Sequence, residues 1–534
     1  MRSVRRADAA RELLLHRRLR LHDPRRPRGR AGQGCRAGRQ PVPDARPHRA
    51  RGGRLPVEPD GRRVRQGRPV SPSGHRGRTP RADRGGPRRG RRRGVIAELL
   101  GAVRRRAQGG DALWRREERT ALAFESGRLK SATTTEEAGV NLRVVKDGRV
   151  GVAGTTAADT ATDGLLDRAL ASAALGEALN LTFPPPSPLP HVPTFSDGAA
   201  NASLAALIGV GQELVARLNR DGCQLNVAIE REVSETEIAN TAGAAGGYRA
   251  TGVGVGVDLT RIAGDDVLMV YDQYVGAALP SAADLDALVR SVTTRLELAL
   301  TVVEPPEGAL PVIFTPAGLA AILLPLEQAL SGKAVLQGVS PLGGKTGERV
   351  FDERFSLTDD PLAAGRAGSR PCDDEAVPSS PLRLVEEGVV RQFVYDLETA
   401  ARAGTTSTGH GRRGIFGKPG IAYTNLLVGT NGQPATDAWQ PGGGLAAGLR
   451  NGLIVEDLIG VGQGNVIGGT FSHPVALAYR VERGEITGRV KDAAVAGNVY
   501  ELLKRIGGFG SDGRWLGTRF APSLLLEGVS VARR

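Results

Sequence analysis

Residues 461–498, near the C-terminus, most constrain what this chain can fold into. Val475–Val481 alternates bulky side chains with small or polar ones, a pattern typical of a strand with one buried face. A tight turn at Arg483-Gly484 is expected to lead into a second strand that ends at Val490. The Gly-rich approach Asn465–Thr470 would let another backbone or a ligand come close. The stretch therefore predicts a sheet face that lines a cleft.

Upstream, the pattern changes between strand and helix periodicity. Alternating runs flank the Asp147-Gly148 turn and predict a hairpin. Helical periodicity is found at Val95–Ala107, Asp159–Leu179, Leu204–Asn219 and Ala282–Leu300. Helices between hairpins, without strict strand–helix alternation, indicate an α+β fold. Two prolines in Glu304–Gly308 mark a boundary, so we predict an N-terminal domain of β-hairpins and helices at 95–304 and a C-terminal β-rich domain at 305–534.

The second half of the chain begins with a strand expected at Leu310–Thr315 and a helix expected at about Ala317–Leu330. Glu387-Gly388 predicts the turn of a later hairpin. Between them, Asp359–Ser380 is polar and rich in Gly, Pro and Asp. This segment is predicted to be an exposed excursion from the sheet.

The formal net charge of +15 is concentrated at the N-terminus. Residues 1–94 contain 30 Arg, no Lys and 7 acidic residues, a net of +23, whereas the remainder carries 42 basic and 50 acidic residues, a net of −8. This leader has no aromatic residue to offset chain entropy, so we expect it to be disordered. It is interpreted either as a basic arm that binds nucleic acid or as a gene model extended in the wrong frame, with the true start near Val95. The absence of Lys favours the second interpretation.

The sequence gives no reason to expect membrane association. No apolar run approaches the roughly 20 residues that a membrane-spanning helix needs. Cys35, Cys223 and Cys372 are too scattered for a disulfide framework or a CxxC metal site. We therefore expect a reducing, cytoplasmic setting.

Several short motifs follow one another in a fixed order. They include STGHGRRG at Ser407–Gly414, YTNLLVGTNG at Tyr423–Gly432, NVIGGTFS at Asn465–Ser472, VAGN at Val495–Asn498 and LLLEGVSV at Leu524–Val531. As an ordered set they resemble the TldD/PmbA family of modulator-of-gyrase peptidases, most closely its PmbA (TldE) branch. The resemblance covers the chain from roughly residue 125 to the C-terminus.

In the zinc-bearing branch of that family, a helix presents HExxxH and a later Cys completes the metal site. The equivalent helix here is Ala317–Gly332, where Leu323, Leu324 and Gln328 occupy the positions of His, Glu and His. Leucine has no ligand atom, glutamine is a poor ligand, and no Cys follows Cys372. The resemblance therefore implies no catalytic residue, no metal ligand and no cofactor in this chain.

The histidine inventory leaves one alternative open. From residue 95 onward the histidines are His191, His410 and His473, and none lies in HExxH or HxxxH spacing. A self-sufficient metallopeptidase would need an unrecognised site, such as His410, His473 and a carboxylate brought together by folding. Otherwise His410 belongs to a Gly-rich loop, and His473 precedes Pro474 at the start of a strand.

Five residues are candidates for substrate binding. Arg412 and Arg413 follow STGHG and could hold a peptide carboxylate or carbonyl, unless they form a solvated basic loop. Thr424 and Asn425 match the family's TN pair, and Asn498 matches its AGN. These three side chains could equally close backbone hydrogen bonds at strand ends.

The resemblance implies a PmbA/TldE-like subunit of a TldD/TldE-type zinc metalloprotease complex in the cytoplasm. Such a complex degrades or trims unfolded peptides, and zinc is expected in a TldD-like, zinc-bearing paralogue. This chain would be non-catalytic and would form part of the substrate chamber, holding extended peptide by strand addition. Nucleic acid would be a partner only through the basic leader.

Overall fold

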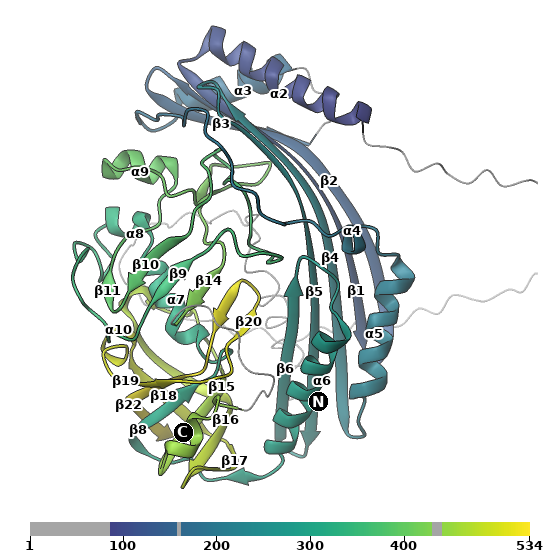
Figure 1. The fold of residues 1–534 in the computed structure, drawn as a ribbon, viewed down its shortest axis with the longest axis vertical. Coiled ribbons are helices and arrows are strands. Elements are labelled where there is room, and N and C mark those ends of the chain that lie inside the picture. Colours follow the sequence, from purple (N-terminus) through teal and green to yellow (C-terminus); the bar gives the residue numbers. More distant parts are fainter. Residues whose placement is uncertain (1–85, 157–161, 430–440) are drawn as a thin grey trace, which may run out of the picture. The chain divides into compact units, whose positions relative to one another are not determined.

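The computed structural model describes residues 86–156, 162–429 and 441–534 (Figure 1). The basic-leader hypotheses therefore fall largely on residues 1–85, outside the described residues. No helix in the described ranges is long and apolar enough to cross a membrane. The helices are α2 Gly86–Arg106, α3 Thr162–Ala174, α4 Asp197–Ala200, α5 Leu204–Leu218, α6 Ala282–Leu298, α7 Ala320–Ala329, α8 Gly332–Leu336, α9 Leu397–Ala403 and α10 Val499–Leu502, with 3-10 turns η1 Leu445–Gly448 and η2 Val466–Gly468.

The first half of the described chain builds one long antiparallel sheet in the order β3-β2-β1-β4-β5-β6. Its strands are β1 Gly109–Glu125, β2 Arg128–Lys146, β3 Arg149–Thr155, β4 Cys223–Asn240, β5 Ala245–Ala263 and β6 Asp266–Gly276. The predicted Asp147-Gly148 turn is present, with both residues at positive φ. Apolar residues of α2 and α3 pack on β1 and β2, whereas α5 and α6 pack towards the other end of the sheet (Figure 1).

Helix α2 begins at Gly86, inside the segment predicted to be disordered, rather than at Val95. Its apolar stripe, which includes Leu99 and Val103, is buried against the sheet. Arginine is a good helix former, and adding residues to an already docked helix requires no new nucleation. The helix therefore extends back along the Arg-rich sequence. The predicted helices near residues 204–219 and 282–300 are confirmed as α5 and α6.

The second half forms two further main sheets. One has the order β11-β10-β9-β14-β21-β20, and the other runs β15-β8-β22-β18-β16-β17-β7 with β19 beside β22. The remaining strands are β7 Val302–Val303, β8 Gly308–Phe314, β9 Leu357–Asp359, β10 Leu382–Glu386, β11 Val389–Val390, β12 Gly411–Arg412, β13 Gly420–Ile421, β14 Leu426–Val428, β15 Asn451–Leu458, β16 Thr470–Glu482, β17 Glu485–Val490, β18 Ala493–Asn498, β19 Ile506–Phe509, β20 Arg514–Leu516, β21 Arg519–Ala521 and β22 Leu524–Arg533. A large apolar cluster draws on both of these sheets and on the buried side of α7.

This mixed architecture with a β-rich C-terminal region confirms the predicted α+β fold class. The boundary at residue 304 stays a prediction, although a buried apolar cluster spans it. That cluster unites Val255 and Leu288 from one side with Ile454 and Tyr479 from the other. The two halves thus share packed surface, and the Tyr479 hydroxyl donates a hydrogen bond to the Arg295 carbonyl at 3.0 Å.

The connection between β9 and β10, residues 360–381, was predicted to be exposed, and this prediction is wrong. Asp373, Asp374 and Glu375 are completely buried, as is Cys372. The segment reaches the first sheet, where Asp374 pairs with Arg115 of β1 at 2.7 Å and Glu375 pairs with Arg143 of β2 at 2.6 Å. Buried carboxylates need such cationic partners. The partners lie far away in sequence, so local polarity gave a misleading signal.

Candidate functional site

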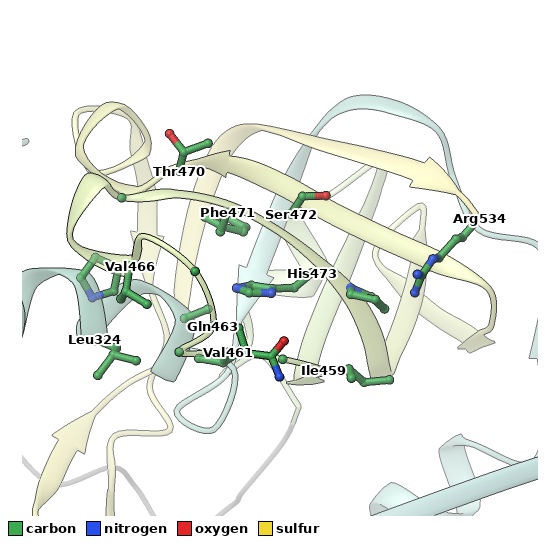
Figure 2. A pocket seen from close by; sticks show the side chains of 17 residues that line it. Leu324, Ile459, Val461, Gln463, Val466, Thr470, Phe471, Ser472, His473 and Arg534 are labelled. Atoms are coloured by element: carbon green, nitrogen blue, oxygen red, sulfur yellow. The ribbon is translucent and has the colours of Figure 1, made fainter. Parts of the chain in front are cut away.

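A hollow of about 530 Å³ lies beside α7. Its floor and walls come from α7, the loop of residues 459–469 and the start of β16. Figure 2 shows Leu324 and Val466 at one side, with His473 and Arg534 farther across. No residue that lines this hollow is acidic, and none is a cysteine. The hollow offers mainly apolar side chains, backbone groups and a few hydroxyls, which suits binding more than acid–base chemistry.

Glycines shape the loop that forms one wall of this hollow. Gly460, Gly462 and Gly464 have φ values of 80°, 90° and 77°, a left-handed conformation that costs glycine little. Gly469, at φ 74°, also lies against Tyr500, where a Cβ would approach the ring to 2.5 Å. The Gly-rich approach predicted from sequence is therefore needed both for backbone conformation and for close packing.

The first part of β16 has one paired and one unpaired edge. Thr470–Pro474 pairs with β18, whereas β15 joins β16 only from Val475 onward. Among the described residues, no strand pairs with the other edge of Thr470–His473, and these residues line the hollow. An unpaired strand edge presents backbone donors and acceptors to any extended chain that lies beside it.

The positions expected for the zinc motif lie on α7, next to the hollow. Leu324 lines it, Leu323 is buried in the core, and Gln328 is exposed. Leucine offers no lone pair to a metal, so the residues present do not fit the zinc site of the family's zinc-bearing branch. Across the described ranges, no group of three or more His, Cys, Asp or Glu side chains is arranged to hold a metal ion.

The two histidines considered for an alternative metal site have separate surroundings. His473 stacks on Phe471, with ring centroids 5.8 Å apart, and lines the hollow. Partial burial lowers the pKa of His473 below its ordinary value, because the charged imidazolium loses hydration. His410 is completely enclosed, and its Nε2 lies 2.8 Å from Asp359 Oδ2.

The Asp359 carboxylate organises the neighbourhood of His410. It accepts hydrogen bonds from the Thr424 amide at 2.8 Å and from the Thr424 hydroxyl at 2.5 Å. The Asn425 side chain donates to the Asp360 carbonyl at 2.7 Å and to Ser369 at 2.9 Å. Thr424 and Asn425, both candidates for substrate binding, are therefore buried and hold the ends of β9 and β14 together.

The two candidate arginines have different environments. Arg412 is exposed and reaches the Tyr248 hydroxyl at 3.5 Å. Arg413 is buried, and its Nη1 donates to Asp111 at 2.8 Å and to Asn141 at 3.1 Å. Of this pair only Arg412 is exposed, and its Nη1 also lies 3.5 Å from the Asp374 carboxylate. The interpretation of both as one solvated loop is therefore wrong. Arg413 is instead committed to a buried charge network.

That network joins Arg115, Arg143 and Arg413 to the acidic run of residues 373–375 and to Asp111. Arg143 bridges Asp111 at 2.5 Å and Glu375 at 2.6 Å. Cations beside Asp111 hold its pKa below the ordinary value although burial opposes them. Burial, with the charges of Asp373 and Asp396, raises the pKa of Glu375 to about 8 despite Arg143. Sequence reasoning missed this network, because none of its members falls in a local motif.

Asn498, the last candidate, forms hydrogen bonds to the segment that makes up one wall of the hollow. Its side chain accepts hydrogen bonds from the Tyr500 and Glu501 amides at the start of α10. It also donates to the Gly468 carbonyl at 3.2 Å and to the Thr470 hydroxyl at 3.1 Å. Asn498 thus fixes the loop that leads into β16.

Comparison with known proteins agrees with this geometry. The PmbA/TldA metallopeptidase C-terminal domain matches residues 307–533, and PmbA/TldA metallopeptidase domain 1 matches residues 110–175. The fold resembles the crystal structure of TldE from Thermococcus kodakarensis, with a TM-score of 0.73 over 82% of this chain and 100% of that one. At 23% identity, that likeness establishes the fold.

Curated relatives include a metalloprotease of Methanothermobacter thermautotrophicus, 31% identical over 43% of this chain and 49% of the relative. A metalloprotease TldD homolog of Haemophilus influenzae is also 31% identical, over 39% of this chain and 42% of the relative. The matches thus span about half the length of these relatives or less. With both family domains present in order, the fold is that of a TldD-type metallopeptidase. The chain belongs to the PmbA/TldD family.

Proposed function

We propose that this chain is a PmbA/TldE-like, non-catalytic subunit that binds extended peptide for a zinc-bearing TldD-like partner. The observation that carries the proposal is the composition of the hollow. Helix α7 presents Leu324 to it, and neither an acidic side chain nor a cysteine lines it. A hydrolytic metal site needs such ligands or a general base.

The unpaired edge of Thr470–His473 supports a peptide as the ligand. A peptide laid beside this edge would exchange backbone hydrogen bonds with β16, and such bonds do not depend on peptide sequence. The apolar surface around Leu324 and Val461 would receive alternate side chains of the peptide. Subunit role, partner and peptide class are parts of this one proposal, as is a cytoplasmic location.

The test is to purify the full chain without any partner and to measure bound zinc and peptidase activity on an unfolded peptide. We expect neither zinc nor hydrolysis from the chain alone. After a zinc-bearing TldD-like protein is added, the mixture should hydrolyse the peptide faster than that protein does by itself. Chelator-sensitive hydrolysis by the chain alone would overturn the proposal.

A variant pair locates the binding surface. Leu324→Trp fills the hollow and should lower the partner-dependent rate by roughly tenfold, equal to about 1.4 kcal/mol of lost binding. Leu336→Trp adds the same side chain at an exposed position of α8 and is the matched control. Equal rates for both variants would place the peptide elsewhere.

A further inference from the structure

The buried arginines of the described ranges follow one rule with one exception. Seven arginine residues are at most 8% exposed. Six of them have a carboxylate at 2.5–3.0 Å. These six are Arg115, Arg143, Arg231, Arg295, Arg413 and Arg489. The rule is expected, because a buried guanidinium without an anion loses hydration with no compensation.

The exception is Arg370, which is 5% exposed and has no carboxylate within 4.0 Å among the described residues. Its Nε and Nη2 are enclosed and have no hydrogen-bond partner. Arg231 and Arg489 each leave one nitrogen unbonded and Arg413 leaves two, but each of these arginines has a carboxylate to balance its charge. Arg370 alone has no carboxylate in direct contact, although the charges of Asp373 and Asp374 act on it from farther away.

A second unpartnered group lies close to Arg370. The Ser379 hydroxyl is buried and has no hydrogen-bond partner. The Ser379 amide donates to the Pro371 carbonyl at 3.0 Å, which places this serine beside the residue that follows Arg370. Two segments of the 360–381 connection therefore bring unsatisfied donors to the same neighbourhood.

The backbone at Arg370 is held firmly. Its amide donates to the Pro361 carbonyl at 3.0 Å, and Asn425 donates to the neighbouring Ser369 hydroxyl at 2.9 Å. A fixed backbone limits how far the guanidinium can move to find another partner. Such preorganisation is typical of residues that receive a ligand.

The nearby acids cannot serve as the missing partner, because each is already committed. Asp373 accepts hydrogen bonds from the amides of Glu375, Val377 and Gly411. Asp374 accepts from the Arg115 side chain and the Arg413 amide. Their negative charges also disfavour a doubly charged ligand such as phosphate, so a singly charged planar anion suits the site best.

We propose that Arg370 is the cation of a carboxylate-binding site, with the Ser379 hydroxyl as an additional donor. The ligand is a monocarboxylate, either free or at the C-terminus of a peptide. Two parallel hydrogen bonds from the guanidinium to the two carboxylate oxygens would satisfy the enclosed nitrogens. The site is independent of the hollow beside α7, so it does not rest on the proposed peptide-handling role.

Isothermal titration of the full chain tests this site with four probes: sodium acetate, penta-alanine as the free acid, the same peptide as its C-terminal amide, and sodium phosphate. We expect the acid to bind and the amide not to bind. Tighter binding of the peptide acid than of acetate identifies a peptide C-terminus, and the reverse identifies a free carboxylate. Arg370→Gln should weaken binding roughly tenfold or more, and Arg370→Lys should weaken it less.

Arg383→Gln is the matched control, because this arginine is 70% exposed and pairs only within its own strand. It should bind like the wild type. Absence of carboxylate binding to the wild type, equal binding by Arg370→Gln, or tighter binding of phosphate would each overturn the proposal. If Arg370→Gln does not fold, the acid–amide comparison on the wild type and the variant Ser379→Ala decide the question.

Discussion

The hollow beside α7 and the 360–381 connection differ in their ionisable side chains: the hollow has few, and the connection has several that are buried. The hollow is open and is lined by leucine, valine, glycine and hydroxyl residues, with His473 and Arg534 as its ionisable side chains. The connection is closed and carries Asp373, Asp374 and Glu375, all fully buried. The four acidic side chains of the connection accept hydrogen bonds from the first sheet or from the connection's own backbone.

Because of this difference, we expect the connection to contribute to stability and the hollow to be available for binding. A carboxylate fixed by a buried arginine is unavailable to a ligand, whereas an exposed strand edge and an apolar wall are available. The residues that resemble catalytic groups by type thus hold the two halves of the chain together. Among the side chains that line the open hollow, only those of His473 and Arg534 are ionisable.

The largest effect is expected from breaking the charge network. Arg143→Met removes the cation between Asp111 and Glu375 and leaves buried acid groups with fewer donors. We expect a loss of about 3–5 kcal/mol in the free energy of unfolding. Urea unfolding followed by circular dichroism measures it.

Arg116→Met, on the adjacent strand β1, is the control. Arg116 pairs with Glu136 at 2.6 Å, but both side chains are partly exposed. Such surface pairs contribute about 0–1 kcal/mol. Similar losses for the two variants would mean that the buried network does not differ from a surface pair, and the comparison above would fail.

Local signals in the sequence predicted much of the fold. The hairpin turn at Arg483-Gly484 is present, with φ values of 51° and 87°, because a two-residue turn is specified by the residues in it. Helix α5 begins at Leu204 as expected, since Ser203 caps it by accepting a hydrogen bond from the Ala206 amide. The Gly-rich approach Asn465–Thr470 does line a hollow.

Long-range pairing could not be predicted in this way. Arg115 and Asp374 are 259 residues apart, and Arg143 and Glu375 are 232 apart. In isolation, residues 373–375 are polar, and polarity is the usual signal for an exposed loop. Likewise, Arg412 and Arg413 are adjacent in sequence, yet Arg412 at the end of β12 is exposed and Arg413, just beyond the strand, is buried.

An intermediate loss of unfolding free energy should distinguish the two neighbouring leucines of α7 when each is replaced by alanine. Leu323 is 2% exposed and packs in the core, so Leu323→Ala should cost about 2–5 kcal/mol of unfolding free energy. Leu324 lines the hollow, and Leu324→Ala should cost about 1 kcal/mol or less, because part of its surface is already solvated. Thermal unfolding of the two variants side by side is the measurement. Equal costs would show that Leu324 is enclosed and that α7 does not face an open surface.

The smallest effect concerns how stability depends on pH. The pKa of Glu375 is raised to about 8 by burial, whereas glutamate in the unfolded chain titrates near pH 4.3. Between these values the folded protein keeps a proton that the unfolded chain has lost, so the stability that this proton gives declines as pH rises from about 5 to about 8. Glu375→Gln cannot lose this proton, and its unfolding free energy should decline less steeply, by up to about 1 kcal/mol per pH unit. Glu136→Gln, at an exposed position, should keep the wild-type slope. A wild-type stability that rises over this pH range, or identical slopes for wild type and Glu375→Gln, would show that Glu375 is ionised in the folded state and that Arg143, rather than burial, sets its charge.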